Sequence, residues 1–174
     1  YGNGLSLTRS FDRAYRMTGI QVPGVLDRTM GYDSRGNIET ITDNLDASRN
    51  QTLGYDALSR LTSAIGAHGN RVYDYDGVGN RLSLTVDGAV DSYGYDSASH
   101  RLLSISGPGS QSYGYDANGN VTTWGAYTLT YDPERNRLTE VSGPGFSASY
   151  TYNAEELRVR SVVNGVESFY FYDL

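Results

Sequence analysis

Two acidic pairs are the residues of this sequence that could most readily do chemistry. Asp74 and Asp76 flank Tyr75, and Glu155 lies next to Glu156. Paired carboxylates can act together as general acid and base. Neighbouring residues of a strand point to opposite faces, so Glu155 and Glu156 should not converge, and Asp76 is already needed by a turn. We therefore expect no catalytic residue and no enzyme activity.

The sequence offers equally little for a metal or a cofactor. His68 and His100 lie in predicted turns or at turn edges, and neither has a second histidine at ligand-like spacing. The Asp-rich turns lack the alternating carboxylates and the distal Glu of a calcium loop. Neither Gly77-Val78-Gly79 nor Gly107-Pro108-Gly109 precedes a predicted helix, so neither resembles a phosphate-binding loop. There is no Cys. We expect no metal and no cofactor.

A repeated Tyr-Asp pair organises the elements that would position any site. Successive copies are 16 to 23 residues apart, and most steps are 20 or 21 residues. Self-similarity at a fixed period is typical of repeat proteins. The complete copies are Tyr32-Asp33, Tyr55-Asp56, Tyr75-Asp76, Tyr95-Asp96, Tyr115-Asp116, Tyr131-Asp132 and Tyr172-Asp173, and the imperfect ones are Phe11-Asp12 and Tyr152-Asn153.

Each pair opens a predicted turn. In Asp116-Ala117-Asn118-Gly119 the Asp can bond the backbone ahead of it, and Gly can adopt positive φ. This pattern is typical of a type I turn with a glycine bulge, and Gly36 and Gly79 occupy the same position in two other copies. Three copies replace this Gly, so we expect either a strained residue or another turn type there; the replacements are Ser59, Ser99 and Arg135.

The residues on either side of the turn favour strands. Tyrosines two residues apart, such as Tyr113 and Tyr115, should share one face of a strand, and alternating segments such as 82–86 follow the turn. Asp87-Gly88 and Asn164-Gly165 are strong hairpin signals that send the chain back. Each repeat is therefore predicted to be a β-hairpin.

The predicted fold is all-β, an antiparallel meander of hairpins with a period of about 20 residues. We expect one domain over residues 1–174, with a less regular entry at 1–30 and regular repeats at 31–174. About 16 strands would curl, because strand twist accumulates, into a spiral shell segment or a barrel-like sheet. No helix longer than about one turn is expected.

Composition excludes several classes of function. The net charge of -6 and the pI of about 4.8 argue against nucleic acid as a partner. No apolar run is long enough to span a membrane as a helix. The chain begins at Tyr1 without the features of a signal peptide, and we expect an excerpt or a processed piece. The 16 Tyr residues and the mean hydropathy of -0.49 indicate a thin sheet, partly solvated on both faces.

The repeats resemble those of RHS proteins, also called YD-repeat proteins. The segments that carry the resemblance are 75–82, 115–122 and 131–138, and in-phase copies cover nearly the whole chain. The resemblance implies a long antiparallel sheet wound into a hollow shell, which in bacterial members encloses a toxic C-terminal segment. It also implies that this piece is too short to enclose a cavity by itself.

Function is expected to follow this resemblance. The chain would be a structural part of a shell that encapsulates a toxin or another guest polypeptide, within a larger bacterial protein that is secreted or at the cell surface. Its partners would be neighbouring repeats and the guest, and its edge strands could pair with another copy.

The alternative is an adhesion module that binds glycan or protein through the Tyr-rich faces. The Tyr rows could instead form cross-strand ladders, with Gly94 and Gly114 leaving room for rings from the next strand.

Overall fold

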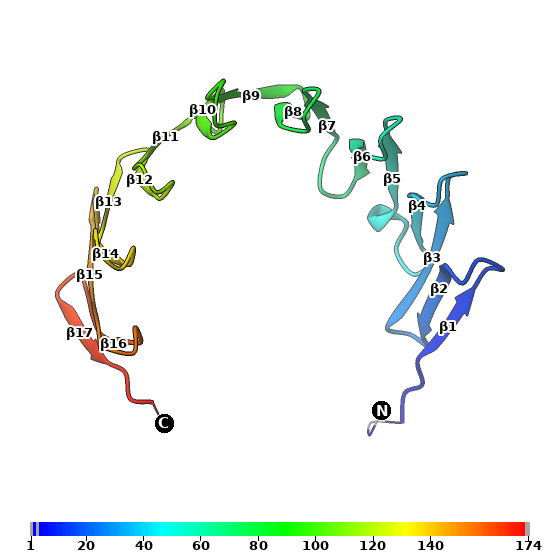
Figure 1. Cartoon of the computed structure of the whole chain (residues 1–174). Coiled ribbons are helices and arrows are strands. Elements are labelled where there is room, and N and C mark those ends of the chain that lie inside the picture. The colour runs from blue at the N-terminus through cyan, green and yellow to red at the C-terminus, as the bar shows by residue number, and fades with distance from the viewer. Residues whose placement is uncertain (1, 3, 173–174) are drawn as a thin grey trace. The chain divides into compact units, whose positions relative to one another are not determined.

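The computed structural model describes residue 2 and residues 4–172, and Asp173 of the last predicted pair lies outside them. This part of the chain is all-β apart from one 3-10 turn, η1 (Ala47–Arg49). Contacts group the residues into two compact units, 1–92 and 93–174. Figure 1 traces each unit as a run of strands joined by short turns.

Unit 1 contains eight complete strands and the first part of a ninth. The strands are β1 (Thr8–Phe11), β2 (Met17–Val22), β3 (Leu26–Tyr32), β4 (Ile38–Asp43), β5 (Gln51–Tyr55), β6 (Leu61–Gly66), β7 (Arg71–Tyr75), β8 (Arg81–Val86) and β9 (Ala89–Tyr95). Each strand pairs antiparallel with the strand that follows it in the chain.

Unit 2 continues the same pattern. Strand β9 also pairs with β10. The strands that follow are β10 (Leu102–Ser106), β11 (Gln111–Tyr115), β12 (Val121–Trp124), β13 (Tyr127–Tyr131), β14 (Leu138–Gly143), β15 (Phe146–Tyr152), β16 (Arg158–Val163) and β17 (Val166–Phe169). Consecutive strands again pair antiparallel. The predicted antiparallel meander of hairpins is confirmed.

A β-bulge recurs beside the Tyr-Asp position. Gly31 pairs with Thr40, but the next residue, Tyr32, pairs with Ile38, so Glu39 is the extra residue of the bulge. The same shift follows Gly54 in β5 and Gly114 in β11, among others. Because a bulge bends the strand and increases its twist, the repeat has this bend built in. This bulge lies beyond the turn and is separate from the glycine bulge that the sequence predicted at Gly36, and the sequence pattern did not reveal it.

The second turn of the hairpin has the predicted geometry where its signal was strongest. Asp87 and Gly88 have φ of 49° and 89°, and Asn164 and Gly165 have φ of 47° and 81°. Positive φ at both central residues is what a type I′ turn requires. The longer segment 43–50 contains η1 and is anchored by buried Asp43, whose carboxylate lies 3.1 Å from Nε of Arg28.

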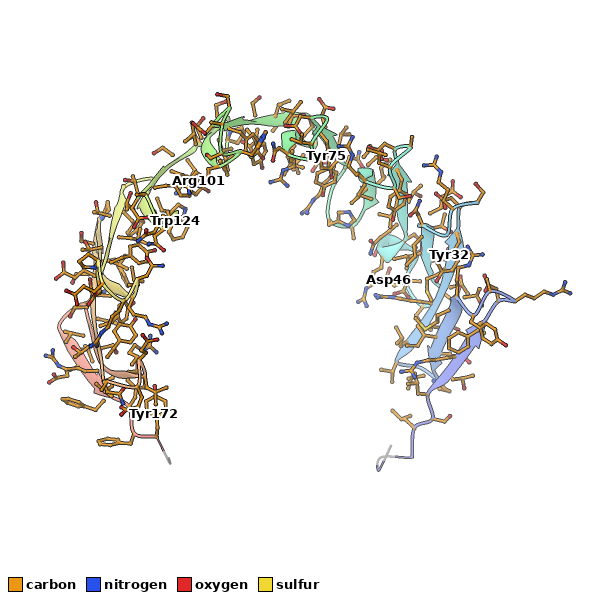
Figure 2. All side chains as sticks on the ribbon, viewed as in Figure 1. Tyr32, Asp46, Tyr75, Arg101, Trp124 and Tyr172 are labelled. Carbon is orange, nitrogen blue, oxygen red and sulfur yellow. The ribbon has the colours of Figure 1, made fainter. Side chains whose placement is uncertain are left out.

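The sheet has almost no enclosed core. Val22, Ala64 and Ala148 are the buried apolar residues among those described. Figure 2 shows side chains projecting from both sides of the strands in each unit. Stability must therefore come mainly from the backbone ladder and from contacts between neighbouring strands, because little apolar surface is removed from water.

The two faces of the sheet differ chemically. On one face Tyr73 lies opposite Leu84, whereas on the other Asp74 lies opposite Ser83. In unit 2 Leu129 lies opposite Val141, and Thr128 lies opposite Ser142 on the other face. We call the first the Tyr face and the second the hydroxyl face. No helix in the described residues is long and apolar enough to cross a membrane.

Candidate functional site

The Tyr-Asp turn is the one constellation that the chain builds repeatedly, and Asp76 shows how it works. Its Oδ1 accepts hydrogen bonds from the backbone N–H groups of Val78 (3.0 Å) and Asn80 (2.8 Å). Its Oδ2 accepts one from Nδ2 of Asn80 at 2.8 Å. The backbone N–H of Asp76 donates to the carbonyl of Asn80 at 2.9 Å, which closes the loop. One carboxylate thus satisfies the donors inside the turn.

The fourth residue of the turn adopts the left-handed conformation, as the glycine pattern predicted. Gly36, Gly79 and Gly119 have φ of 92°, 100° and 91°. Ser59 has φ of 60° without being glycine, so that turn keeps its type and carries a strained residue. Tyr15 and Glu156 occupy the same turn position and are also left-handed, with φ of 61° and 64°.

Two turns change type instead. The N–H of Asp96 bonds the carbonyl of Arg101, and the N–H of Asp132 bonds that of Arg137, so each loop is one residue longer. The left-handed residues there are His100 and Asn136, both at φ of 57°. Ser99 and Arg135, which stand at the predicted glycine position, donate their backbone N–H groups to the turn Asp. Both outcomes expected for turns without glycine therefore occur.

These hydrogen bonds lower the pKa of the turn aspartates. For Asp33 the largest cause is the hydrogen bond from the side-chain amide of Asn37, and for Asp116 it is the same bond from Asn120. For Asp12 it is the backbone N–H of Arg16, and the same kind of bond dominates at Asp56, Asp96 and Asp132. At Asp76 burial is the largest single cause and opposes the shift, but the hydrogen bonds from Asn80, Val78 and Gly79 together lower the pKa as well.

In six of the described copies the tyrosine of the pair links its repeat to the one before it. Tyr115 donates its hydroxyl hydrogen bond to the carbonyl of Leu102, the first residue of β10, at 2.8 Å. The accepting carbonyl belongs to the first residue of the preceding post-turn strand in every instance. The other bonds are Tyr32 to Met17 (2.7 Å), Tyr55 to Ile38 (2.9 Å), Tyr75 to Leu61 (2.8 Å), Tyr152 to Leu138 (2.9 Å) and Tyr172 to Arg158 (2.9 Å).

Sequence reasoning placed these rings on one face but missed this bond. Tyr95 and Tyr131 occupy the same position at the ends of β9 and β13. Burial and the charge of Asp116 raise the pKa of Tyr131, and burial and the charge of Asp33 raise that of Tyr55. The hydroxyls of Tyr55 and Tyr131 therefore stay protonated across the usual pH range.

The predicted role of the small residues between tyrosines was wrong. A Cβ at Gly94 would lie 2.8 Å from Oγ of Ser104, and one at Gly114 would lie 3.1 Å from Oγ1 of Thr123. The space that these glycines leave is therefore filled by a hydroxyl of the neighbouring strand, not by a ring, because they point to the hydroxyl face. A ring does fill such a space elsewhere: Tyr127 packs over Gly143.

The candidates for chemistry are not brought together. Asp74 accepts the N–H of Tyr75, and Asp76 holds its turn. Glu156 forms an ion pair with Arg137, and Glu155 is exposed. Neither His68 nor His100 belongs to a group of three or more potential metal ligands, since the described residues contain no such group.

An exposed aromatic group lies on the Tyr face of unit 2. The ring centres of Trp124 and Tyr127 are 5.9 Å apart, and those of Tyr127 and Phe146 are 6.3 Å apart. With Val141 these side chains line a shallow hollow, and half of Trp124 is exposed. The lining contains no charged side chain, so this hollow suits packing of an apolar group.

Comparison with known proteins identifies the repeat. Residues 4–173 match the family model described as Teneurin YD-shell. The tRNA nuclease WapA of Bacillus subtilis (strain 168) is 31% identical over 123 residues, which is 68% of this chain and 5% of that protein.

Two solved structures show the same fold at low identity. A chain of the crystal structure of TcdB2-TccC3-Cdc42 matches 88% of this chain with a TM-score of 0.69 and 16% identity, and the match spans 11% of that chain. The Photorhabdus luminescens Tc holotoxin pore matches 93% with a TM-score of 0.68 and 20% identity, and the match spans 10% of its chain. This chain belongs to the Teneurin YD-shell family, and its antiparallel meander is a structural module of such a shell.

Proposed function

We propose that this chain is a stretch of wall in a hollow shell that encloses and shields a guest polypeptide such as a toxin. The observation that carries the proposal is a sheet one layer thick in which most repeats are tied to the repeat before them by a tyrosine hydroxyl. Such a sheet stabilises itself without a packed core on either face. A wall built in this way leaves both faces free, one for solvent and one for a guest.

The mechanism is steric and needs no catalysis. Strands paired by a continuous ladder of backbone hydrogen bonds leave no gap large enough for a protease. A guest segment enclosed by the sheet is therefore protected from cleavage. Tyrosine side chains, with an apolar ring and a polar hydroxyl, can contact the guest at the surface of the sheet without forming a deep binding pocket. We infer that the chain is not an enzyme and uses no metal or cofactor.

The partners follow from the two edge strands. Both β1 and β17 are exposed along their whole length. An unpaired strand edge presents free N–H and C=O groups to another chain. We infer that neighbouring repeats of a longer, exported protein cover these edges, and that the isolated chain self-associates through them. Size-exclusion chromatography of residues 1–174 should show dimers or larger species, and a monomer at all concentrations contradicts the self-association.

Protease protection tests the enclosure. The longer protein is expressed with its repeats and guest, and the guest is followed by gel during limited proteolysis. We expect a protected guest in the unchanged protein and a digested one in Gly66→Val, because a Cβ at Gly66 would lie 2.8 Å from the backbone carbonyl oxygen of Asn50 in the neighbouring segment. Gly77→Val is the matched control, since a Cβ there has open space around it. Rapid digestion of the guest in the unchanged protein would overturn the proposal.

A further inference from the structure

The Tyr-Asp turns are of two kinds, which alternate along the sequence. In one kind an arginine follows the left-handed residue, and in the other an asparagine follows a glycine. The arginine turns end at Arg16, Arg60, Arg101 and Arg137, and the asparagine turns end at Asn37, Asn80 and Asn120. We propose that repeats are joined in pairs, in which each arginine turn is the recognition surface for the repeat that follows it. This holds whatever the wall encloses.

The arginine reaches forward by one repeat. The guanidinium of Arg16 lies 4.5 Å from the ring centre of Tyr32, and that of Arg60 lies 4.8 Å from the ring centre of Tyr75. In unit 2 the corresponding distance from Arg101 to Tyr115 is 5.5 Å. A planar guanidinium over an aromatic ring is attracted by the ring quadrupole. Each contact joins the arginine turn to the Tyr-Asp pair of the next turn.

The same arginines also bond the next turn or their own. Nη1 of Arg60 donates to the backbone carbonyl of Asp76 at 2.8 Å, while its Nε lies 2.6 Å from Oδ2 of its own Asp56. Nη1 of Arg101 donates to the carbonyl of Asp116 at 3.3 Å. Only arginine has several fixed donors and a flat face for stacking at once. The chain contains no lysine, so all 14 of its Lys and Arg residues are arginine.

Glycine in the second turn fits this contact in two of the pairs. A Cβ at Gly119 would lie 2.9 Å from Nη2 of Arg101, and one at Gly36 would lie 3.6 Å from Nη1 of Arg16. The last pair departs from the pattern in a compensating way. Glu156 replaces the glycine and forms an ion pair with Arg137. In these three pairs the left-handed residue of the second turn accommodates the arginine of the first, whereas Gly79, in the turn that Arg60 reaches, has open space around it.

The junctions after asparagine turns inside each unit are different. Asn37 donates to Oγ of Ser59 at 3.1 Å, and Asn120 bonds the side chain of Asn136. Arg35 adds one bond to the carbonyl of Asp56. Within the described residues no arginine lies over the rings that open these turns, Tyr55 and Tyr131.

Amide hydrogen exchange of the whole chain tests the pairing. In Arg60→Lys, which keeps the charge but loses the planar group, we expect the amides of Val78 and Asn80 in the next turn to exchange about three- to tenfold faster. In Asn37→Ala, the matched change at an asparagine junction, the amides of Leu58 and Arg60 should change by less than about twofold. Equal effects at both junctions, or an Arg60→Lys effect confined to its own turn, would overturn the proposal.

Deletions provide a second readout if a point variant misfolds. Removing residues 56–95 joins Tyr55 to Asp96 and keeps the alternation, whereas removing residues 76–95 brings two arginine turns together. For the first deletion we expect one cooperative urea transition with a nearly unchanged midpoint. For the second we expect a lower midpoint, although it removes fewer residues. A second deletion as stable as the first contradicts the pairing.

Discussion

The hydroxyl bond between repeats can be removed alone by Tyr115→Phe. Phenylalanine keeps the ring under the guanidinium of Arg101, which lies 5.5 Å from the ring centre, and loses only the bond to the carbonyl of Leu102 at 2.8 Å. A half-buried hydrogen bond contributes about 0.5–1.5 kcal/mol, and the carbonyl left behind is only partly open to water. We expect a loss of about 1 kcal/mol, or about 2–4 °C in the unfolding temperature for a chain of this size.

The assay is urea unfolding followed by far-UV circular dichroism. Tyr113→Phe is the matched control, because it is the other ring of the same strand and its hydroxyl makes no hydrogen bond within the described part of the chain. Combining Tyr115→Phe with Tyr55→Phe, which lies in unit 1, should double the loss, since distant sites add. If Tyr115→Phe costs no more than Tyr113→Phe, the hydroxyl bonds do not hold the repeats together.

Three further changes test the turns. The turn aspartates, such as Asp116, have lowered pKa values, so their contribution to stability is complete above about pH 4 and is progressively lost as the pH falls through the lowered values. The urea concentration at the unfolding midpoint should therefore decrease when the pH is lowered below about 4, and a midpoint that does not change with pH contradicts the assignment. Gly119→Ala should cost more than Gly79→Ala in unfolding free energy: both bring a Cβ to positive φ, at about 1 kcal/mol, but only the first also displaces Arg101. Tyr15→Gly should raise the unfolding free energy by about 1 kcal/mol, because Tyr15 is left-handed and 89% exposed, and a loss on calorimetry refutes the strain.

Local turn chemistry was predictable from the sequence because it depends on residues close together in the chain. An Asp at the first position and a Gly at the fourth were enough to predict the turn at Asp116. The extra residue in the turn at Asp96 was not predictable, because Ser99 bonds the Asp through both its N–H and its hydroxyl and moves the left-handed position to His100.

Contacts between repeats were harder to predict because they depend on register. The spacing of Tyr113 and Tyr115 placed both rings on one face, but the partner of the Tyr115 hydroxyl is fixed by the pairing of β10 with β11. The bulge after Gly114 has no sequence signal of its own. The role of that glycine was mispredicted for the same reason, since the side chain opposite it, Thr123, is set by register.

The most direct test of the wall is an electron cryomicroscopy map of the longer protein that contains these repeats. The proposal predicts that further strands pair with β1 and with β17, and that density for a guest polypeptide lies on one face of the sheet only. A map in which both edges remain unpaired, or in which the guest lies away from the sheet, contradicts it.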